Sequence, residues 1–199
     1  MDKGPKSCNG EIEMTTFDFD DGKGPVPAHK HPNGGGWVAD TAKVAKTAYV
    51  GAEARVYGNA KVFGDAMVFG NARVYGDARV YDNAKVSGYA LVYDNARVYV
   101  YARVYGDARV FGNVQVFGDA RVFGNAQVFG DAQVYYNAGV YDNAKVYGNA
   151  KDFDTSEDIF IEMNGKRYKL VEIVWGWIND WYDRLLWRST EQAVSVTVR

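Results

Sequence analysis

A hydrophobic position recurs every six residues through the middle of the chain. Val stands at position 38 and at every sixth position up to 146, which gives nineteen consecutive hexads over residues 38–151. Ala stands four residues after each Val, with Val114 as the single replacement. An aromatic residue follows Val in fifteen of the sixteen hexads from Tyr57 to Tyr147, and Ser87 is the exception. An uninterrupted period of six predicts a solenoid of short stacked units.

Each hexad is typical of a short strand followed by a corner. In the stretch A-R-V-Y, residues 72–75, strand alternation puts Ala and Val on one side and Arg and Tyr on the other. The G-N or G-D pair between such stretches turns the chain, because Gly and Asn tolerate positive φ. We therefore expect Val inside along each side, Ala inside at the corners, and the aromatic and basic side chains outside.

The hexad V-Y-G-N-A-R resembles the hexapeptide repeat of left-handed parallel β-helix proteins, and the resemblance covers residues 38–151. It implies an all-β solenoid with three hexads per coil, a triangular section, left-handed winding and about six coils. Residues 26–51, VPAHKHPNGGGWVADTAKVAKTAYVG, resemble the beginning of bacterial and phage-borne hexapeptide proteins labelled transferases. That second similarity implies a phage or prophage origin.

The repeat divides the chain into three expected parts. Residues 1–37 are expected to form a lead-in or cap, residues 38–151 the β-helix, and residues 152–199 a small C-terminal α+β module. The register breaks at Asp152, which occupies the next Val position.

The C-terminal module contains three predicted elements. Residues 159–174 alternate around Asn164-Gly165 and predict a β-hairpin. Residues 175–187 carry apolar side chains at helical spacing and predict a helix, and residues 193–199 predict a last strand. We expect this module to cover the open strand edge of the last coil.

Catalysis in the resembling family depends on histidines. Its acyltransferases use a histidine on a coil as general base, and its carbonic anhydrases use three histidines around a metal. Here both histidines, His29 and His31, precede the first hexad. A general base must lie within hydrogen-bond reach of its proton, so we expect no catalytic residue and no cofactor.

The lead-in offers weak metal signals. The H-x-H of His29 and His31 supplies two imidazoles but no third fixed ligand, so we expect no metal site and an ordered loop. The sequence FDFDD at residues 17–21 matches no standard calcium loop and is expected to be a solvated acidic stretch.

Composition excludes several other classes. Charged residues make up 24% of the chain and the net charge is −2, which argues against a general nucleic-acid binder or an anionic-membrane binder. The single Cys8 requires no oxidising compartment, and no apolar run is long enough to span a membrane. We expect a cytoplasmic protein, in the host-cell cytoplasm if a phage encodes it.

The outward aromatic residues are expected to stack. With three hexads per coil, every third hexad lies on the same face, so neighbouring rings are about 5 Å apart. The three expected columns run from Tyr57 to Tyr147, from Phe63 to Tyr135, and from Phe69 through Ser87 to Tyr141. Exposed columns of this length favour side-by-side assembly. The resemblance implies that this assembly is a homotrimer, because members of that family are commonly trimers packed side to side.

The leading hypothesis is a non-enzymatic interaction protein, phage-borne and trimeric, that binds a host or defence-system protein. In the tail, Trp177, Tyr182 and Trp187 are the candidate partner-binding residues. One alternative is an acyltransferase-type hexapeptide enzyme, and another is a nucleotide- or sugar-binding protein with sites between subunits. The candidate oligomer or ligand surface comprises Tyr75, Tyr93, Arg97, Tyr99, Arg103, Tyr105 and Arg109.

Overall fold

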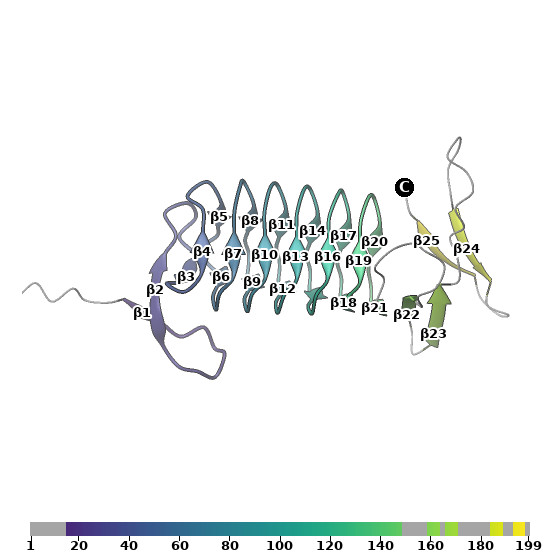
Figure 1. Ribbon diagram of the computed structural model, residues 1–199, viewed down its shortest axis with the longest axis horizontal. Helices are drawn as coiled ribbons and strands as arrows, with labels where there is room; N and C mark the ends of the chain where they lie inside the picture. Colours follow the sequence, from purple (N-terminus) through teal and green to yellow (C-terminus); the bar gives the residue numbers. More distant parts are fainter. Residues whose placement is uncertain (1–14, 149–158, 164–165, 171–183, 189–192, 198–199) are drawn as a thin grey trace, which may run out of the picture.

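The computed structural model is a prism of stacked parallel coils with antiparallel strands at its ends (Figure 1). It describes residues 15–148 and, beyond them, the backbones of residues 159–163, 166–170, 184–188 and 193–197. All elements in these ranges are strands. The predicted parallel β-solenoid is confirmed, whereas its left-handed winding stays a prediction.

Three parallel sheets, called faces 1, 2 and 3, form the sides of the prism. Strands on one face lie eighteen residues apart, so that Val62, Val80 and Val98 are in register. Face 1 comprises β3 (Trp37–Ala39), β6 (Arg55–Val56), β9 (Arg73–Val74), β12 (Leu91–Val92), β15 (Arg109–Val110), β18 (Gln127–Gly130) and β21 (Lys145–Gly148). Face 2 comprises β4 (Lys43–Val44), β7 (Lys61–Val62), β10 (Arg79–Val80), β13 (Arg97–Val98), β16 (Gln115–Val116) and β19 (Gln133–Val134). Face 3 comprises β5 (Tyr49–Val50), β8 (Met67–Val68), β11 (Lys85–Val86), β14 (Arg103–Val104), β17 (Arg121–Val122) and β20 (Gly139–Val140).

Antiparallel strands extend face 1 at both ends. At the N-terminal end, β1 (Thr16–Phe17) pairs with β2 (Val26–Lys30), which pairs with β3. At the other end, β22 (Ile159–Met163) pairs with β21 and with β23 (Lys166–Leu170). The expected hairpin therefore covers the edge of the last face 1 strand.

The interior consists of the repeated Val and Ala side chains. Those between Ala48 and Val128 are fully buried, and Val114, which replaces Ala at one corner, is buried equally well. The predicted placement of buried Val along the sides and buried Ala at the corners is confirmed. Ala fits there because consecutive coils leave little room inside a tight bend.

The corners depend on one residue with positive φ. Gly58 has φ of 67°, and a Cβ on it would lie 3.0 Å from the backbone nitrogen of Gly76 in the next coil. Asp94 takes the same conformation at φ 57°, and its Oδ2 accepts a hydrogen bond from the Gly112 N–H at 3.3 Å. Val100 also has φ of 63°, which is strained for a β-branched residue.

The last two strands correct part of the sequence prediction. Residues 184–187, expected at the end of a helix, lie in β24 (Arg184–Arg188), which pairs antiparallel with β25 (Ala193–Thr197). A short apolar run fits both periods, and pairing with the alternating segment that follows selects the strand. The rest of the expected helix, residues 175–183, lies outside the described residues, as does the predicted turn at 164–165.

Enlarging an interior corner should destabilise the prism. Ala120 is fully buried at the corner before β17, so Ala120→Leu should lower the free energy of unfolding by about 2–3 kcal/mol through overpacking. Urea denaturation measures the change. The control, Arg121→Leu, adds an apolar side chain at the neighbouring outward position and should stay within about 0.5 kcal/mol. Equal effects of the two variants would contradict the interior placement of Ala.

Relieving the strained corner should stabilise the prism. Val100→Gly removes an unfavourable positive φ, and we expect a gain of about 1 kcal/mol in the free energy of unfolding. Thermal and urea denaturation measure it. Asp94→Gly is the control, because it relieves similar strain but loses the hydrogen bond to Gly112, so its gain should be smaller.

Candidate binding surface

Aromatic rings stack along each face at the spacing of the coils. On face 1, neighbouring ring centroids from Tyr57 to Tyr147 are 4.8–5.2 Å apart and their planes lie within 9° of parallel. Stacking also joins Tyr81 to Tyr135 on face 2, and Tyr105 to Tyr141 on face 3. These parts of the predicted columns are confirmed.

Two predicted columns are shorter than expected. Within residues 15–148, neither Phe63 nor Phe69 has a ring contact with its column. Ser87 explains the break on face 3, because it separates Phe69 from Tyr105 by one coil without a ring. Nothing in the structure explains the break at Phe63, whose side chain is 40% exposed.

Burial raises the pKa of five phenols in the columns. Burial raises the pKa of Tyr75 to about 12, with smaller contributions from the neighbouring Tyr57 and Tyr93. Burial is also the main cause that raises the pKa of Tyr57, Tyr81, Tyr93 and Tyr99. These five phenols therefore remain neutral at physiological pH.

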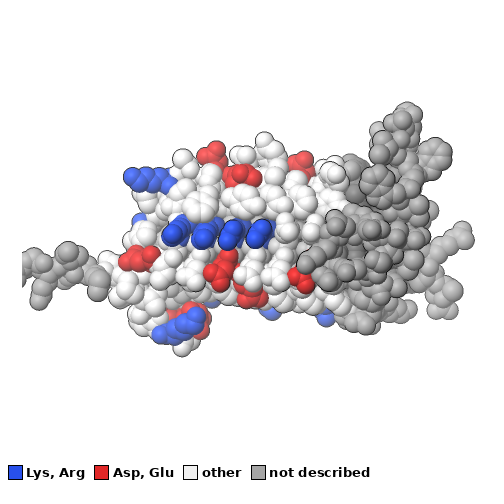
Figure 2. All heavy atoms as spheres, in the orientation of Figure 1, with Lys and Arg blue, Asp and Glu red and all other residues white. Residues whose placement is uncertain are grey.

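Basic side chains form a second set of rows beside the rings. The residue before each Val shares the outward side with the ring that follows Val. Figure 2 shows such a row running straight along the prism, over the strands of face 2. The row consists of Lys43, Lys61, Arg79 and Arg97. None of the four forms an ion pair within residues 15–148.

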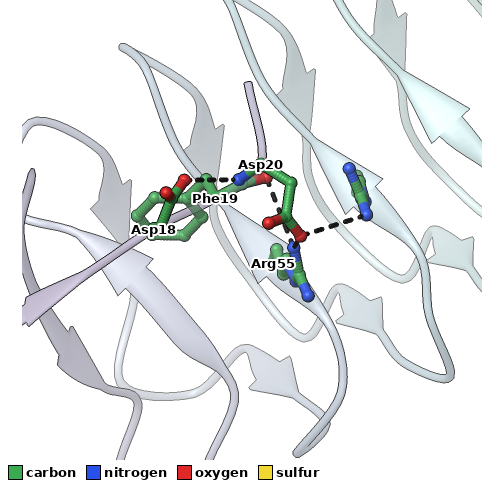
Figure 3. Close-up of polar contacts among 5 residues, drawn as sticks. Asp18, Phe19, Asp20 and Arg55 are labelled. Atoms are coloured by element: carbon green, nitrogen blue, oxygen red, sulfur yellow. Dashed lines mark hydrogen bonds and ion pairs between the residues drawn. The ribbon is translucent and has the colours of Figure 1, made fainter. Parts of the chain in front are cut away.

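On face 1, unlike on face 2, the N-terminal segment contributes a carboxylate that pairs with the basic row. Phe19 is 2% exposed and stacks on Tyr57 at 4.8 Å, which extends the ring column by one member. The next residue, Asp20, forms an ion pair with Arg55, and its Oδ2 lies 3.8 Å from Nη2 of Arg73 (Figure 3). One dipeptide thus provides a ring for the column and a carboxylate for two stacked cations.

The acids of residues 17–21 are exposed, as expected of a solvated acidic stretch, but Phe17 and Phe19 pack on the first coils, which was not expected. Phe17 stacks on Trp37 at 4.3 Å, and Phe19 belongs to a buried cluster with Ala28, Ala39 and Tyr57. The hydrogen bond and the charge of Arg55 lower the pKa of the Asp20 carboxyl. The sequence contains a signal for this contact, because F-D-F-D alternates rings and acids where the coils alternate rings and bases.

The two histidines hold the lead-in to the first coil. The His29 Nδ1 lies 2.8 Å from Oδ1 of Asp40. His31 is 2% exposed, and its Nε2 donates a hydrogen bond to the Ala45 carbonyl at 3.2 Å. Its Nδ1 lies 3.1 Å from the Asn33 carbonyl oxygen and 3.3 Å from the Asn33 nitrogen. Within residues 15–148, no three His, Cys, Asp or Glu side chains are grouped to hold a metal ion. The expected ordered lead-in is present, with residues 26–30 in β2.

The structure separates the other candidate residues. Trp177 and Tyr182 lie outside the described residues, and Trp187 lies in β24. The seven candidates for an oligomer or ligand surface lie on all three faces, so one subunit does not bring them into a single site. Face 1 carries Tyr75, Tyr93 and Arg109, face 2 carries Arg97 and Tyr99, and face 3 carries Arg103 and Tyr105.

Comparison with known proteins supports the repeat. The family described as YdcK beta solenoid repeat matches residues 66–82, 72–88, 102–118 and 114–130. A crystal structure of a hexapeptide transferase family protein from Anaplasma phagocytophilum is similar over 56% of this chain and 72% of that chain, at 12% identity and a TM-score of 0.37. A likeness this distant carries no argument about activity. No curated protein matches.

The repeat matches and the stacked coils together define the class: this chain contains a hexapeptide-repeat β-helix. No helix in the described part of the chain is long and apolar enough to cross a membrane.

The raised pKa of Tyr75 predicts a loss of stability in alkali. The unfolded chain ionises this phenol near pH 10, whereas the folded protein keeps it protonated to about pH 12. Stability should therefore fall as the pH rises from about 10 to 12. Tyr75→Phe removes the ionisation, so the urea midpoint should fall less between pH 8 and pH 11 in the variant. An identical fall in both proteins would contradict the role of burial.

Proposed function

We propose that this protein is a rigid scaffold that binds an acidic protein partner through face 2. The observation that carries the proposal is the row of Lys43, Lys61, Arg79 and Arg97 beside the ring column. The row is outward, straight and without acidic partners among residues 15–148.

The electrostatics of this row favour an acidic partner. Neighbouring cations are one coil apart, about 5 Å, and two unit charges at that distance repel by about 0.8 kcal/mol in water. Salt screens part of this repulsion, and the long side chains splay to reduce it further. Carboxylates placed between the charges turn repulsion into attraction, as Asp20 does for Arg55 and Arg73 on face 1.

The ring column adds apolar contact area beside the charges. Tyr81, Tyr99 and Phe117 stack on one another in the column. Because this stacking already restricts their side chains, they lose little conformational freedom on binding. Tyr and Arg are also enriched among the residues that dominate interface energies. A regular solenoid holds all of these groups in fixed positions before the partner arrives.

The proposal includes a trimeric assembly and a phage-borne context. The exposed columns support side-by-side association, and the resemblance of residues 26–51 to phage-borne hexapeptide proteins supports the context. We further propose that the partner is a host or defence-system protein. In such a trimer face 2 should point outward, since three cation rows around one axis would repel.

The tail belongs to the same proposal. Trp177, Tyr182 and Trp187 are of the residue types favoured as interface anchors. Their proposed role is to add a second contact region at the C-terminal end of the scaffold.

Charge reversal on face 2 tests the proposal. The triple variant Lys61→Glu, Arg79→Glu and Arg97→Glu should lose capture of the partner from a bacterial lysate, with affinity reduced at least 100-fold for the purified partner. Mass spectrometry identifies the captured protein and light scattering gives the subunit number. The control keeps the charge through Lys61→Arg, Arg79→Lys and Arg97→Lys, and should retain capture.

Three outcomes would contradict parts of this account. Equal capture by the charge-reversed variant and by the control would remove face 2 from the function. If capture instead depended only on Trp177→Ala with Trp187→Ala, the binding surface would be the tail. A monomer by light scattering would remove the trimer.

A further inference from the structure

The contact of the N-terminal segment with face 1 fills a gap in a ring column. Ala39 occupies the position after Val38 where the repeat places an aromatic ring, and β3 lies in register with β6. Phe19 packs against Ala39 and Tyr57 and stands where the missing ring would be. Asp20, the next residue, reaches the two cations that flank the column, Arg55 and Arg73.

Face 3 repeats this arrangement, and no side chain of residues 15–148 stacks on it in the way that Phe19 does on face 1. Ser87 stands where the repeat places a ring, and Val86 is in register with Val104 of the next coil. The ring after the gap is Tyr105, which stacks on Phe123 at 4.9 Å with planes 1° from parallel. Ser87 on face 3 corresponds to Ala39 on face 1, the position without a ring. The two rings that follow, Tyr105 and Phe123, correspond to Tyr57 and Tyr75. The two cations beside them, Arg103 and Arg121, correspond to Arg55 and Arg73.

The gap at Ser87 is one ring wide. Phe69 borders it on the other side, so two coil steps, about 10 Å, separate the backbone positions of Phe69 and Tyr105. A planar ring halfway between them would have the same spacing as the other members of the column. Arg103 and Arg121 have no ion pair in residues 15–148, in contrast to their counterparts on face 1.

Two further departures from the repeat border this face. Tyr89 and Tyr101 stand at corners where the repeat places Asn or Asp, and they are 64% and 56% exposed. Tyr89 lies two residues after Ser87, at the corner that follows β11. Tyr101 lies in the next coil, at the corner that precedes β14. One corner of the Ser87 coil and one corner of the next coil thus carry an exposed aromatic ring where the repeat carries a short polar side chain.

We propose that face 3 binds a protein segment in which an aromatic residue is followed by an acidic one, with its ring in the gap at Ser87. This ring stacks on Tyr105, and the carboxylate that follows lies between Arg103 and Arg121. The chain's own Phe19-Asp20 contact supplies the geometry, and the two arginines, which form no ion pair within residues 15–148, supply the charge complementarity. The inference rests on the proposed function as a protein-binding scaffold, and it names the chemistry of a partner on a second face.

A synthetic peptide of residues 15–22, TTFDFDDG, is the probe for this site. The full-length protein should bind it with a dissociation constant in the range of 10–500 μM, measured by calorimetry. Ser87→Tyr restores the repeat and fills the gap, so it should weaken peptide binding at least tenfold and raise the melting temperature by continuing the column. Ser87→Ala keeps the gap open and should bind within twofold of wild type.

Charge and ring are tested separately. Arg103→Gln with Arg121→Gln should weaken peptide binding at least fivefold and reduce its salt dependence. Peptides with Ala for the second Phe, or with Asn for the Asp that follows it, should each bind at least fivefold more weakly. The scrambled peptide DTGFTDDF, in which no acid follows a ring, controls for composition.

The proposal is overturned if Ser87→Tyr binds the peptide within twofold of Ser87→Ala, or if wild type shows no binding at 2 mM peptide. Binding of adenosine monophosphate that depends on Ser87, without peptide binding, would assign the gap to nucleotides instead. These outcomes do not depend on face 2. The proposed function fails if the charge-reversed face 2 variant captures the partner as well as its control does. Because that result concerns face 2 alone, it can be distinguished from a failure of the peptide site on face 3.

Discussion

The structure depends on the return of the backbone to the same register after eighteen residues. Through most of the coils, the N–H groups of the residues before and after Val donate to carbonyls seventeen residues further on, as in Lys61 to Ala78 and Tyr81 to Val98. This constraint places every residue directly above its repeat counterpart. Val then stacks on Val and ring on ring, which is favourable, but cation also stacks on cation, which is not. The surface chemistry of the protein follows from that last consequence.

The solenoid could be predicted from the sequence because its contacts are periodic. A residue such as Val80 meets Val62 and Val98, and the spacing of eighteen is visible in the repeat itself. The Phe19–Tyr57 contact could not be predicted in this way. It joins a non-repeating segment to a coil, and local alternation does not say which face that segment covers. The segment at 184–188 shows a related limit, since its apolar pattern fits either period and its strand partner decides.

In a repeat this regular, the exceptions are more informative than the consensus. Ala39 lacks a ring because Phe19 provides one from outside the repeat. Val100 takes a conformation in which most coils place Gly or Asp, and so stores strain that the fold does not require. Ser87 also stands where the repeat places a ring. The contact of Phe19 at Ala39 shows how a ring from outside the repeat can occupy such a position. None of these positions is explained by the needs of the core.

Antiparallel strands close both ends of the face 1 sheet. A parallel coil presents, at each end, the hydrogen-bonding edge that another coil of the same kind would use. On face 1 those edges are occupied by β2 and β22, whose direction is reversed, and β1 and β23 follow them. An identical molecule arriving end-on finds no matching polarity there. On this face, the reversed strands therefore oppose end-on growth into fibrils.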